Sequence, residues 1–284
     1  MITRANNDRL NRVTAALSRN ARQLEALSDF SWCLHPHEPR RGSVIATLEG
    51  NWLVLTAADS LGLMADAAPW SLLKRCAALS GFAKFARMTG GGVQLRAELP
   101  VLEEADLAGR IREACDGFES GLTLYDFSQS DAAPETPAGK TDLKRLCTEA
   151  GWSFIERGPE KLLVELESSA GFRQAAMVVN ASGIHLSCEL ATCDSLAGES
   201  RDAIATLLLS VSGMVRLARA VLVAEVAQLE VSFNAPACAA EISSALESLS
   251  VGCSLCGEEI KMLQDPAIAR RFLALRERSA ELVA

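Results

Sequence analysis

The chain repeats itself: three blocks of its first half recur in the same order in its second half. Residues 80–87 match residues 212–219, and residues 93–99 match residues 227–233 after a two-residue difference in length. Apolar and glycine positions between Leu107 and Leu124 then match positions between Cys238 and Leu255 at one constant offset. Because the gaps fall where turns are expected, this order predicts an internal duplication, which restricts the fold to one that two copies of a small domain can build.

Local patterns give each block a structure. Residues 93–99 and 227–233 alternate apolar and polar side chains, which is typical of a strand with one buried face. The glycine-rich residues 89–92 favour an antiparallel hairpin between residues 82–88 and 93–99. Residues 103–119 and 237–251 carry apolar side chains at intervals of three and four, so each segment predicts an amphipathic helix.

The remaining patterns complete each copy. Strands are expected over residues 43–48 and 52–57 in the first copy, and over residues 162–166, 174–179 and 184–190 in the second. Helices are expected at 8–27 and 141–150, and again at 68–79 and 200–210, where Gly81 and Gly213 end them. The predicted fold is α+β: two tandem repeats, each an antiparallel sheet with helices packed on it, in the order helix, three strands, helix, two-strand hairpin, helix.

Domain boundaries follow from one polar segment. Residues 126–139 contain two prolines and small polar residues without periodicity, so they are interpreted as a linker. The first domain then covers residues 1–125, and the second covers residues 140–284 with a helical extension at 265–283. A length of 284 residues suits two domains, and we expect two hydrophobic cores.

Composition restricts the class of protein. Hydrophobic residues make up 49% of the chain and charged residues 23%, which is typical of a globular protein. A net charge of -8 disfavours nucleic acid as a partner. Neither a secretion signal nor a spanning apolar run is recognised, and nine cysteines indicate buried thiols in a reducing compartment. We therefore expect a cytoplasmic protein with no membrane partner.

One cluster suggests a metal site. Cys33, His35 and His37 occupy alternate positions, which in an extended segment would place three potential ligands on one side. Pro36 and Pro39 instead favour a loop, and no fourth ligand is evident. We expect no metal there, although metal binding stays an open alternative.

Other reactive residues favour structural roles. Cys253 and Cys256 have redox spacing, but they replace apolar residues of the first copy at the end of a predicted helix, which favours packing. His185 lies on the polar phase of its strand and is expected to face solvent or a partner. No nucleophile occurs in a glycine-elbow context, so we predict no enzyme activity, no catalytic residues and no cofactor.

Two segments resemble a known family. Residues 143–154, a short helix that runs through Gly151 and Trp152 into a strand, are similar to the opening of YbjN-like domains, and residues 82–100 resemble their hairpin. The element order resembles the type III secretion chaperone-like fold. Members of that class lack catalytic residues and act as homodimers that hold a partially unfolded secretion substrate. The resemblance implies that the two fused copies form an intramolecular pseudo-dimer.

Two functional hypotheses follow. The first is a non-enzymatic binding module, chaperone-like or adaptor, that holds a protein segment at sheet edges or at exposed apolar positions of its helices. The alternative is a small-molecule or metal-binding sensor with a pocket between the two copies, for which Cys33, His35 and His37 are the first residues to test. The sequence identifies neither the partner nor the oligomeric state.

Overall fold

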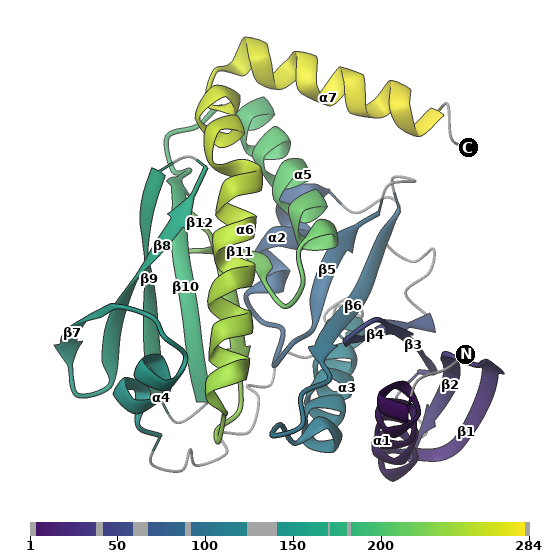
Figure 1. The fold of residues 1–284 in the computed structure, drawn as a ribbon. Coiled ribbons are helices and arrows are strands. Elements are labelled where there is room, and N and C mark those ends of the chain that lie inside the picture. The colour runs from purple at the N-terminus through teal and green to yellow at the C-terminus, as the bar shows by residue number, and fades with distance from the viewer. Residues whose placement is uncertain are drawn as a thin grey trace.

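The computed structural model describes residues 4–37, 42–58, 68–88, 92–123, 141–169, 171–180 and 183–281. Over these residues the chain forms two six-stranded antiparallel sheets with helices packed on them (Figure 1). The α+β class is therefore confirmed. The linker expected at 126–139 lies outside the described residues, so the domain boundaries stay predictions.

Both halves build the same succession of elements. The first half contains α1 (Arg4–Asn20), β1 (Ala21–Ser28), β2 (Ser31–Pro36), β3 (Val44–Glu49), β4 (Trp52–Ala57), α2 (Pro69–Cys76), β5 (Lys84–Arg87), β6 (Val93–Pro100) and α3 (Leu107–Thr123). The second half contains α4 (Leu143–Glu149), β7 (Phe154–Gly158), β8 (Lys161–Ser168), β9 (Gly171–Asn180), β10 (Gly183–Thr192), α5 (Gly198–Met214), β11 (Arg219–Val223), β12 (Val226–Phe233) and α6 (Ala239–Leu263), followed by α7 (Pro266–Glu281).

The strand order is also the same in both sheets. The first sheet runs β1-β2-β3-β4-β6-β5, and the second runs β7-β8-β9-β10-β12-β11. Each half therefore has four strands before its second helix, and the predicted three were wrong. Identical order in sequence and in space is what a duplicated domain would give.

Strand register makes the two halves comparable residue by residue. One buried row crosses each sheet through directly paired residues: Trp32, Ala46, Leu55 and Ala97 in the first, and Leu162, Met177, Leu186 and Val231 in the second. These rows align β2 with β8, β3 with β9, β4 with β10 and β6 with β12.

Two glycines support the same alignment. A Cβ at Gly121 in α3 would lie 2.7 Å from Leu95 Cδ2, and a Cβ at Gly252 in α6 would lie 2.6 Å from Leu229 Cδ1. Both helices thus carry glycine where they approach the sheet at matching leucines of β6 and β12. The sequence comparison matched the same residues.

The first sequence block needs a correction. Lys84 of β5 pairs with Arg96, and Arg219 of β11 pairs with Glu230, the counterpart of Arg96. Lys84 therefore corresponds to Arg219, whereas the sequence comparison matched it with Arg216. The shift arises because the connections from α2 to β5 and from α5 to β11 differ in length.

Several element boundaries also differ from the predictions. The first helix ends at Asn20, and residues 21–28, expected to continue it, form β1. The segment around Cys33 to His37, for which a loop was favoured, forms β2 up to Pro36, and the strand expected after Trp152 is β7. The helix expected to stop at Gly213 includes that residue, and the helix expected over 237–251 continues to Leu263. The C-terminal extension is helical, as α7.

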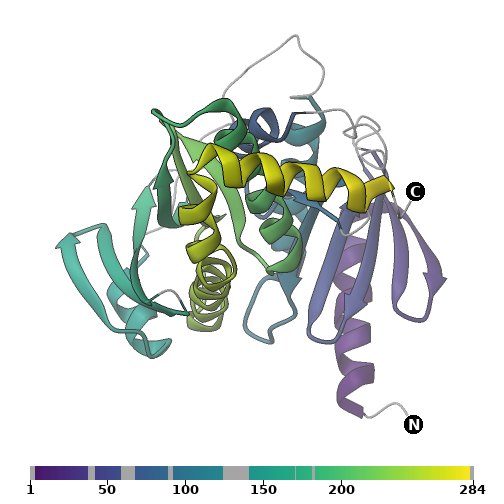
Figure 2. The same cartoon turned by 90° about the horizontal axis from the view of Figure 1, so that it is seen from above.

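The two halves interlock by exchanging helix contacts. Helix α5 of the second half packs on β5 of the first, while α2 of the first half packs on β11 of the second, and the two helices touch. We call this contact between α2, β5, α5 and β11 the seam. The outer strands β1 and β7 lie at opposite ends of the molecule (Figures 1 and 2). Each half thus covers the inner edge strand of the other.

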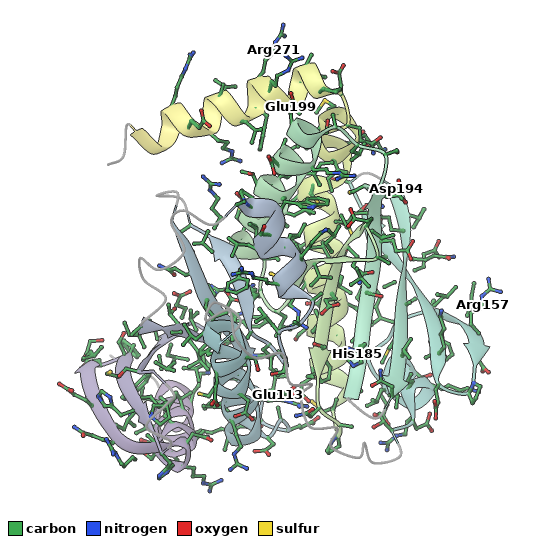
Figure 3. All side chains as sticks on the ribbon, turned by 180° about the vertical axis from the view of Figure 1, so that it is seen from behind. Glu113, Arg157, His185, Asp194, Glu199 and Arg271 are labelled. Carbon is green, nitrogen blue, oxygen red and sulfur yellow. The ribbon has the colours of Figure 1, made fainter. Side chains whose placement is uncertain are left out.

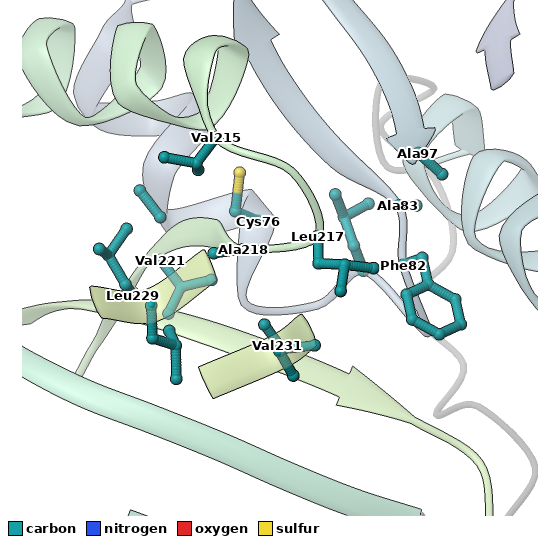
Figure 4. Packing of buried hydrophobic residues seen from close by; sticks show 14 of the residues in the cluster. Cys76, Phe82, Ala83, Ala97, Val215, Leu217, Ala218, Val221, Leu229 and Val231 are labelled. Carbon is teal, nitrogen blue, oxygen red and sulfur yellow. The ribbon is translucent and has the colours of Figure 1, made fainter. Parts of the chain in front are cut away.

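Apolar packing is continuous across the seam. Phe82 and Ala83 of the first half lie near Leu217 and Val231 of the second in one buried cluster that includes residues of both halves (Figure 4). The expectation of two separate cores was therefore wrong. Exchange of helices between the halves merges the cores, because each second helix buries its apolar face partly against the other half.

Buried charges bind backbone across the seam reciprocally. Lys84 Nζ donates to the carbonyl oxygens of Val215 and Ala218 at 2.7 and 3.3 Å, and it lies 2.6 Å from Glu98 Oε2. Arg219 donates in the other direction, to the carbonyl oxygen of Ala83 at 3.0 Å. Since Ala83 and Ala218 each directly precede one of these cations, the two contacts are mirror copies of each other.

A second buried ion cluster joins α3 to the start of α6. Arg110 Nε lies 2.7 Å from Glu241 Oε1, and Arg110 Nη1 lies 3.1 Å from Glu113 Oε2. The guanidinium also lies over the stacked rings of Phe82 and Phe233, which come from different halves. These contacts fasten the halves together at the end of the seam.

Candidate functional site: an open groove in the second half

A groove of about 690 Å³ opens beside β8 and α6. It is lined by the turn at 151–153, by Glu165, Glu167 and the residues that end β8, by Phe172, and by Ser250 and Ser254 of α6. The groove belongs to the second half alone and lies toward the β7 end of the molecule, away from the seam.

The groove exists because the outermost strand of the second sheet is short. Strand β7 pairs with β8 only as far as Val164, which faces Phe154. In the first sheet β1 continues further, so that Gln23 faces His35 and Ala21 faces Pro36. The counterparts of His35 and Pro36 are Glu165 and Leu166, which have no paired strand residue on that side among the described residues.

The connection between helix and strand explains the difference. Helix α1 passes directly into β1 at Ala21, whereas α4 ends at Glu149 and the chain turns before β7 begins at Phe154. Gly151 adopts φ +78°, and the backbone nitrogen of Trp152 donates to the carbonyl oxygen of Cys147 at 3.0 Å. Glycine tolerates this left-handed conformation, so the turn ends the helix and moves residues 151–153 away from β8.

Serines of α6 hold the free end of β8. Ser250 Oγ donates to the carbonyl oxygen of Glu167, and Ser254 Oγ accepts from the backbone nitrogen of Ser169 at 3.1 Å. These bonds fix the last residues of β8 on the side that β7 does not cover, while β9 pairs with them on the other side.

The lining combines negative charge with aromatic surface. Glu165 and Glu167 are exposed carboxylates on the same side of β8. Phe172 is 73% exposed, and Trp152 is held at the groove by a hydrogen bond from Nε1 to Ser243 Oγ at 3.4 Å. Such a surface suits a ligand with positive and apolar groups.

Sequence reasoning missed this groove. Its lining comes from three segments that are distant in sequence, and it depends on a strand being shorter than its counterpart. The Gly151-Trp152 pair was the available signal, because it interrupts the passage from helix to strand that α1 and β1 make directly.

The predicted metal candidate lies elsewhere. Cys33 and His35 sit on β2, with Cys33 Sγ 3.6 Å from His35 Nε2, while His35 Nδ1 lies 3.0 Å from Ser43 Oγ. Exposed His37 follows the strand. Among the described residues no group of three His, Cys, Asp or Glu side chains is arranged to hold a metal ion. Burial and nearby Glu25 raise the pKa of the Cys33 thiol, which disfavours the thiolate that would bind metal.

The described residues pack closely along the seam between the two copies. Apolar side chains and the buried ion pairs occupy the seam. A second cavity, of about 280 Å³, lies between α1 and α3 and is lined by residues of the first half only, including Arg12 and Arg19. Cys33 and His35 are also remote from the seam, because β2 and β5 stand at different ends of the sheet order.

The cysteine pair of redox spacing is buried inside α6. Cys253 and Cys256 have no exposed surface, and Cys253 Sγ lies 3.5 Å from Cys188 Sγ of β10. Burial raises the pKa of Cys256 to about 12. These thiols pack between α6 and the sheet, in the middle of a helix that was predicted to end before them.

His185 lies close to the seam rather than in solvent. Figure 3 shows His185 and Glu113 near the middle of the molecule, whereas Arg157 lies at its outer edge. Half-buried His185 faces Ser232 across the β10–β12 pair, and burial lowers its pKa, with nearby Arg219 acting in the same direction and Glu230 opposing it. His185 is therefore a side chain packed within the sheet beside the charged Arg219 and Glu230.

Comparisons with known proteins return no relative. No protein-family model matches the chain, and neither a curated protein nor a solved structure matches it. Within the described residues, no helix combines the length and apolar character that crossing a membrane requires.

Proposed function

We propose that this protein is a non-enzymatic binding module, chaperone-like or adaptor, that holds a segment of another protein in the cytoplasm. The observation that carries the proposal is an apolar stripe on the outer face of α6. Val251, Leu255 and Met262 are 52%, 40% and 52% exposed and share one side of the helix. Exposed apolar surface of this kind is typical of a protein-interaction site.

The stripe adjoins the groove. Val251 directly follows Ser250 and Leu255 directly follows Ser254, and both serines line the groove. An apolar helix face next to a free strand end offers both modes by which a domain commonly holds a peptide, namely helix-face packing and strand addition.

The interlocked halves support the chaperone-like part of the proposal. Reciprocal contacts from Lys84 to Ala218 and from Arg219 to Ala83 are those of a two-fold related pair. In a type III secretion chaperone-like protein this pair would be an intramolecular pseudo-dimer, in which two halves of one chain replace the two subunits of a homodimer.

Buried thiols support a non-enzymatic role. Burial raises the pKa of Cys76 to about 12 and that of Cys147 to about 11, so these groups stay protonated at neutral pH. A nucleophilic cysteine requires the opposite environment.

Quantitative affinity purification from the native cytosol tests the proposal. We expect the wild-type chain to capture a protein that the V251E/L255E variant loses, because a carboxylate on the stripe must be desolvated when the partner docks. The matched control is L27E, which changes a residue of β1 that is 54% exposed. Equal capture by V251E/L255E and the wild type would refute the proposal, as would equal loss in both variants.

A further inference from the structure

We propose that the groove binds one extended, basic segment of the partner protein per chain, in the position beside β8 that the start of β1 occupies beside β2. This inference rests on the proposed function and adds to it the location, the chemistry and the number of bound segments.

The first half shows what fits beside this strand. Ala21 and Gln23 of β1 run antiparallel to β2, opposite Pro36 and His35. In the second half the turn at 151–153 leaves the matching stretch of β8 facing the groove. A strand that is unpaired along one edge is a template for another extended chain. The segment that binds beside β8 is therefore extended.

Charge defines the occupant's side chains. Glu165 and Glu167 stand where the first half has His35 and His37, and the described lining residues include no Lys or Arg. Arg173 of neighbouring β9 donates from Nη1 to the carbonyl oxygen of Glu189 at 3.1 Å, away from this lining. Two carboxylates on one side of a strand favour Lys or Arg at alternate positions of the segment.

Aromatic surface defines the positions in between. Successive side chains of an extended segment point to opposite sides. If its basic side chains face Glu165 and Glu167, the intervening ones lie on the other face of β8, toward α6, where Trp152 is bonded to Ser243. Phe172 pairs with Glu167 and therefore lies on the same face as the carboxylates. The matching segment therefore alternates basic and apolar residues.

The free strand end is held in place before binding. The bonds from Ser250 to the Glu167 carbonyl and from the Ser169 nitrogen to Ser254 order the end of β8 against α6. A pre-ordered strand lowers the entropic cost of binding. The first half lacks this site because β1 covers the equivalent stretch, so one segment binds per chain.

Fluorescence anisotropy of the full-length chain tests the charge argument. The probe is a labelled peptide of about six residues that alternates lysine and valine. We expect E165Q/E167Q to weaken binding about tenfold or more, because each carboxylate contributes a charge-assisted hydrogen bond. The control E103Q/E104Q removes the same charge from exposed positions of the first half, and its effect should stay within about twofold, as expected for distant, screened charges.

Backbone pairing has its own test. The same peptide, N-methylated at the residues whose N–H groups would face β8, should lose binding, and isothermal titration of the unmodified peptide should give one site per chain. Equal weakening by both double variants, tolerance of N-methylation, two sites per chain, or no saturable binding up to about 1 mM would each overturn the inference.

The purification experiment separates the two proposals. If the partner depends on Val251 and Leu255 but E165Q/E167Q captures it as well as the wild type, the groove inference fails and the proposed function stands. If the peptide binds as expected but no captured protein depends on the α6 stripe, the groove binds peptides and the proposed function fails.

Discussion

Lys84 and Arg219 are charged side chains that the fold encloses, with 0% and 3% of their surfaces exposed. Removing a charge from water costs several kcal/mol unless partners compensate. Here carbonyl oxygens of the opposite half, Glu98 and Glu230 provide the compensation. Burial lowers the pKa of Lys84, while the ion pair with Glu98 opposes that shift. These residues therefore make the stability of each half depend on the other.

Substitution of Lys84 tests this dependence. We expect K84M to lower the free energy of unfolding by about 3 kcal/mol, the low end for a broken buried pair, because Arg96 still pairs with Glu98. The control K74M removes an exposed ion pair to Glu225 that also crosses the seam, and it should cost about 1 kcal/mol or less. Urea unfolding measures both, and equal effects of the two variants would contradict the role of buried charge.

The pKa shift of His185 gives a pH dependence. Its folded-state pKa is lowered below the ordinary value of 6.5, mainly by burial. Between the two values the unfolded chain binds the proton more readily, so His185 destabilises the fold as the pH falls through 6.5, and the effect levels off below the folded pKa. The wild type should therefore lose more stability than H185Q between about pH 7 and 5. Parallel pH profiles of the two proteins in urea unfolding would show that His185 contributes nothing.

The residue patterns predicted which positions are buried better than they predicted which residues of the two halves correspond to each other. The sequence comparison correctly matched Leu95 with Leu229 and Gly121 with Gly252, because core positions obey a regular period. It assigned Lys84 the wrong counterpart, because the alignment followed similar residue types through connections of different length. A charged residue within a strand carries no local sign that another half of the chain will cover it.

At the scale of elements, helix α5 approaches β5 unusually closely. A Cβ at Gly213 would lie 2.6 Å from the carbonyl oxygen of Arg87, which is backbone and cannot move aside easily. Glycine here serves close packing across the seam, whereas the sequence predicted that it would end the helix.

The variant G213A tests the close approach. We expect it to destabilise the protein by about 1–3 kcal/mol, because the added methyl group pushes α5 away from β5. G198A, in the first turn of the same helix, has nothing within 4 Å of its Cβ and should be neutral or slightly stabilising. Thermal unfolding of both variants provides the comparison, and a neutral G213A would show that α5 has room to move.

Elements with a clear period were predictable, and elements set by tertiary pairing were not. Residues 93–99 and 227–233 form the strands their alternation indicated. Residues 21–28 contain helix-favouring Leu, Glu and Ala, yet pairing with β2 makes them a strand, since strand preference depends on neighbours. The groove depends on tertiary pairing in the same way, because it exists where β7 is shorter than β1, and Gly151-Trp152 was its one local signal.

At the scale of the whole molecule, the two similar halves share one buried cluster. The sequence predicted two cores from length alone, but each half contributes a helix to the other, and the buried cluster includes residues from both. Arg110 adds ion pairs between α3 and the first turn of α6. The seam covers the inner edge strands β5 and β11 of both sheets, whereas the outer strands β1 and β7 lie away from it.

Hydrogen exchange resolved by mass spectrometry, followed through low concentrations of urea, tests this interlocking directly. We expect the slowest amides of β4 and β6 and those of β10 and β12 to exchange with the same free energy of opening, and R219A to lower both values together. Different opening free energies in the two sheets, or an R219A effect confined to the second, would contradict a single cooperative fold built across the seam.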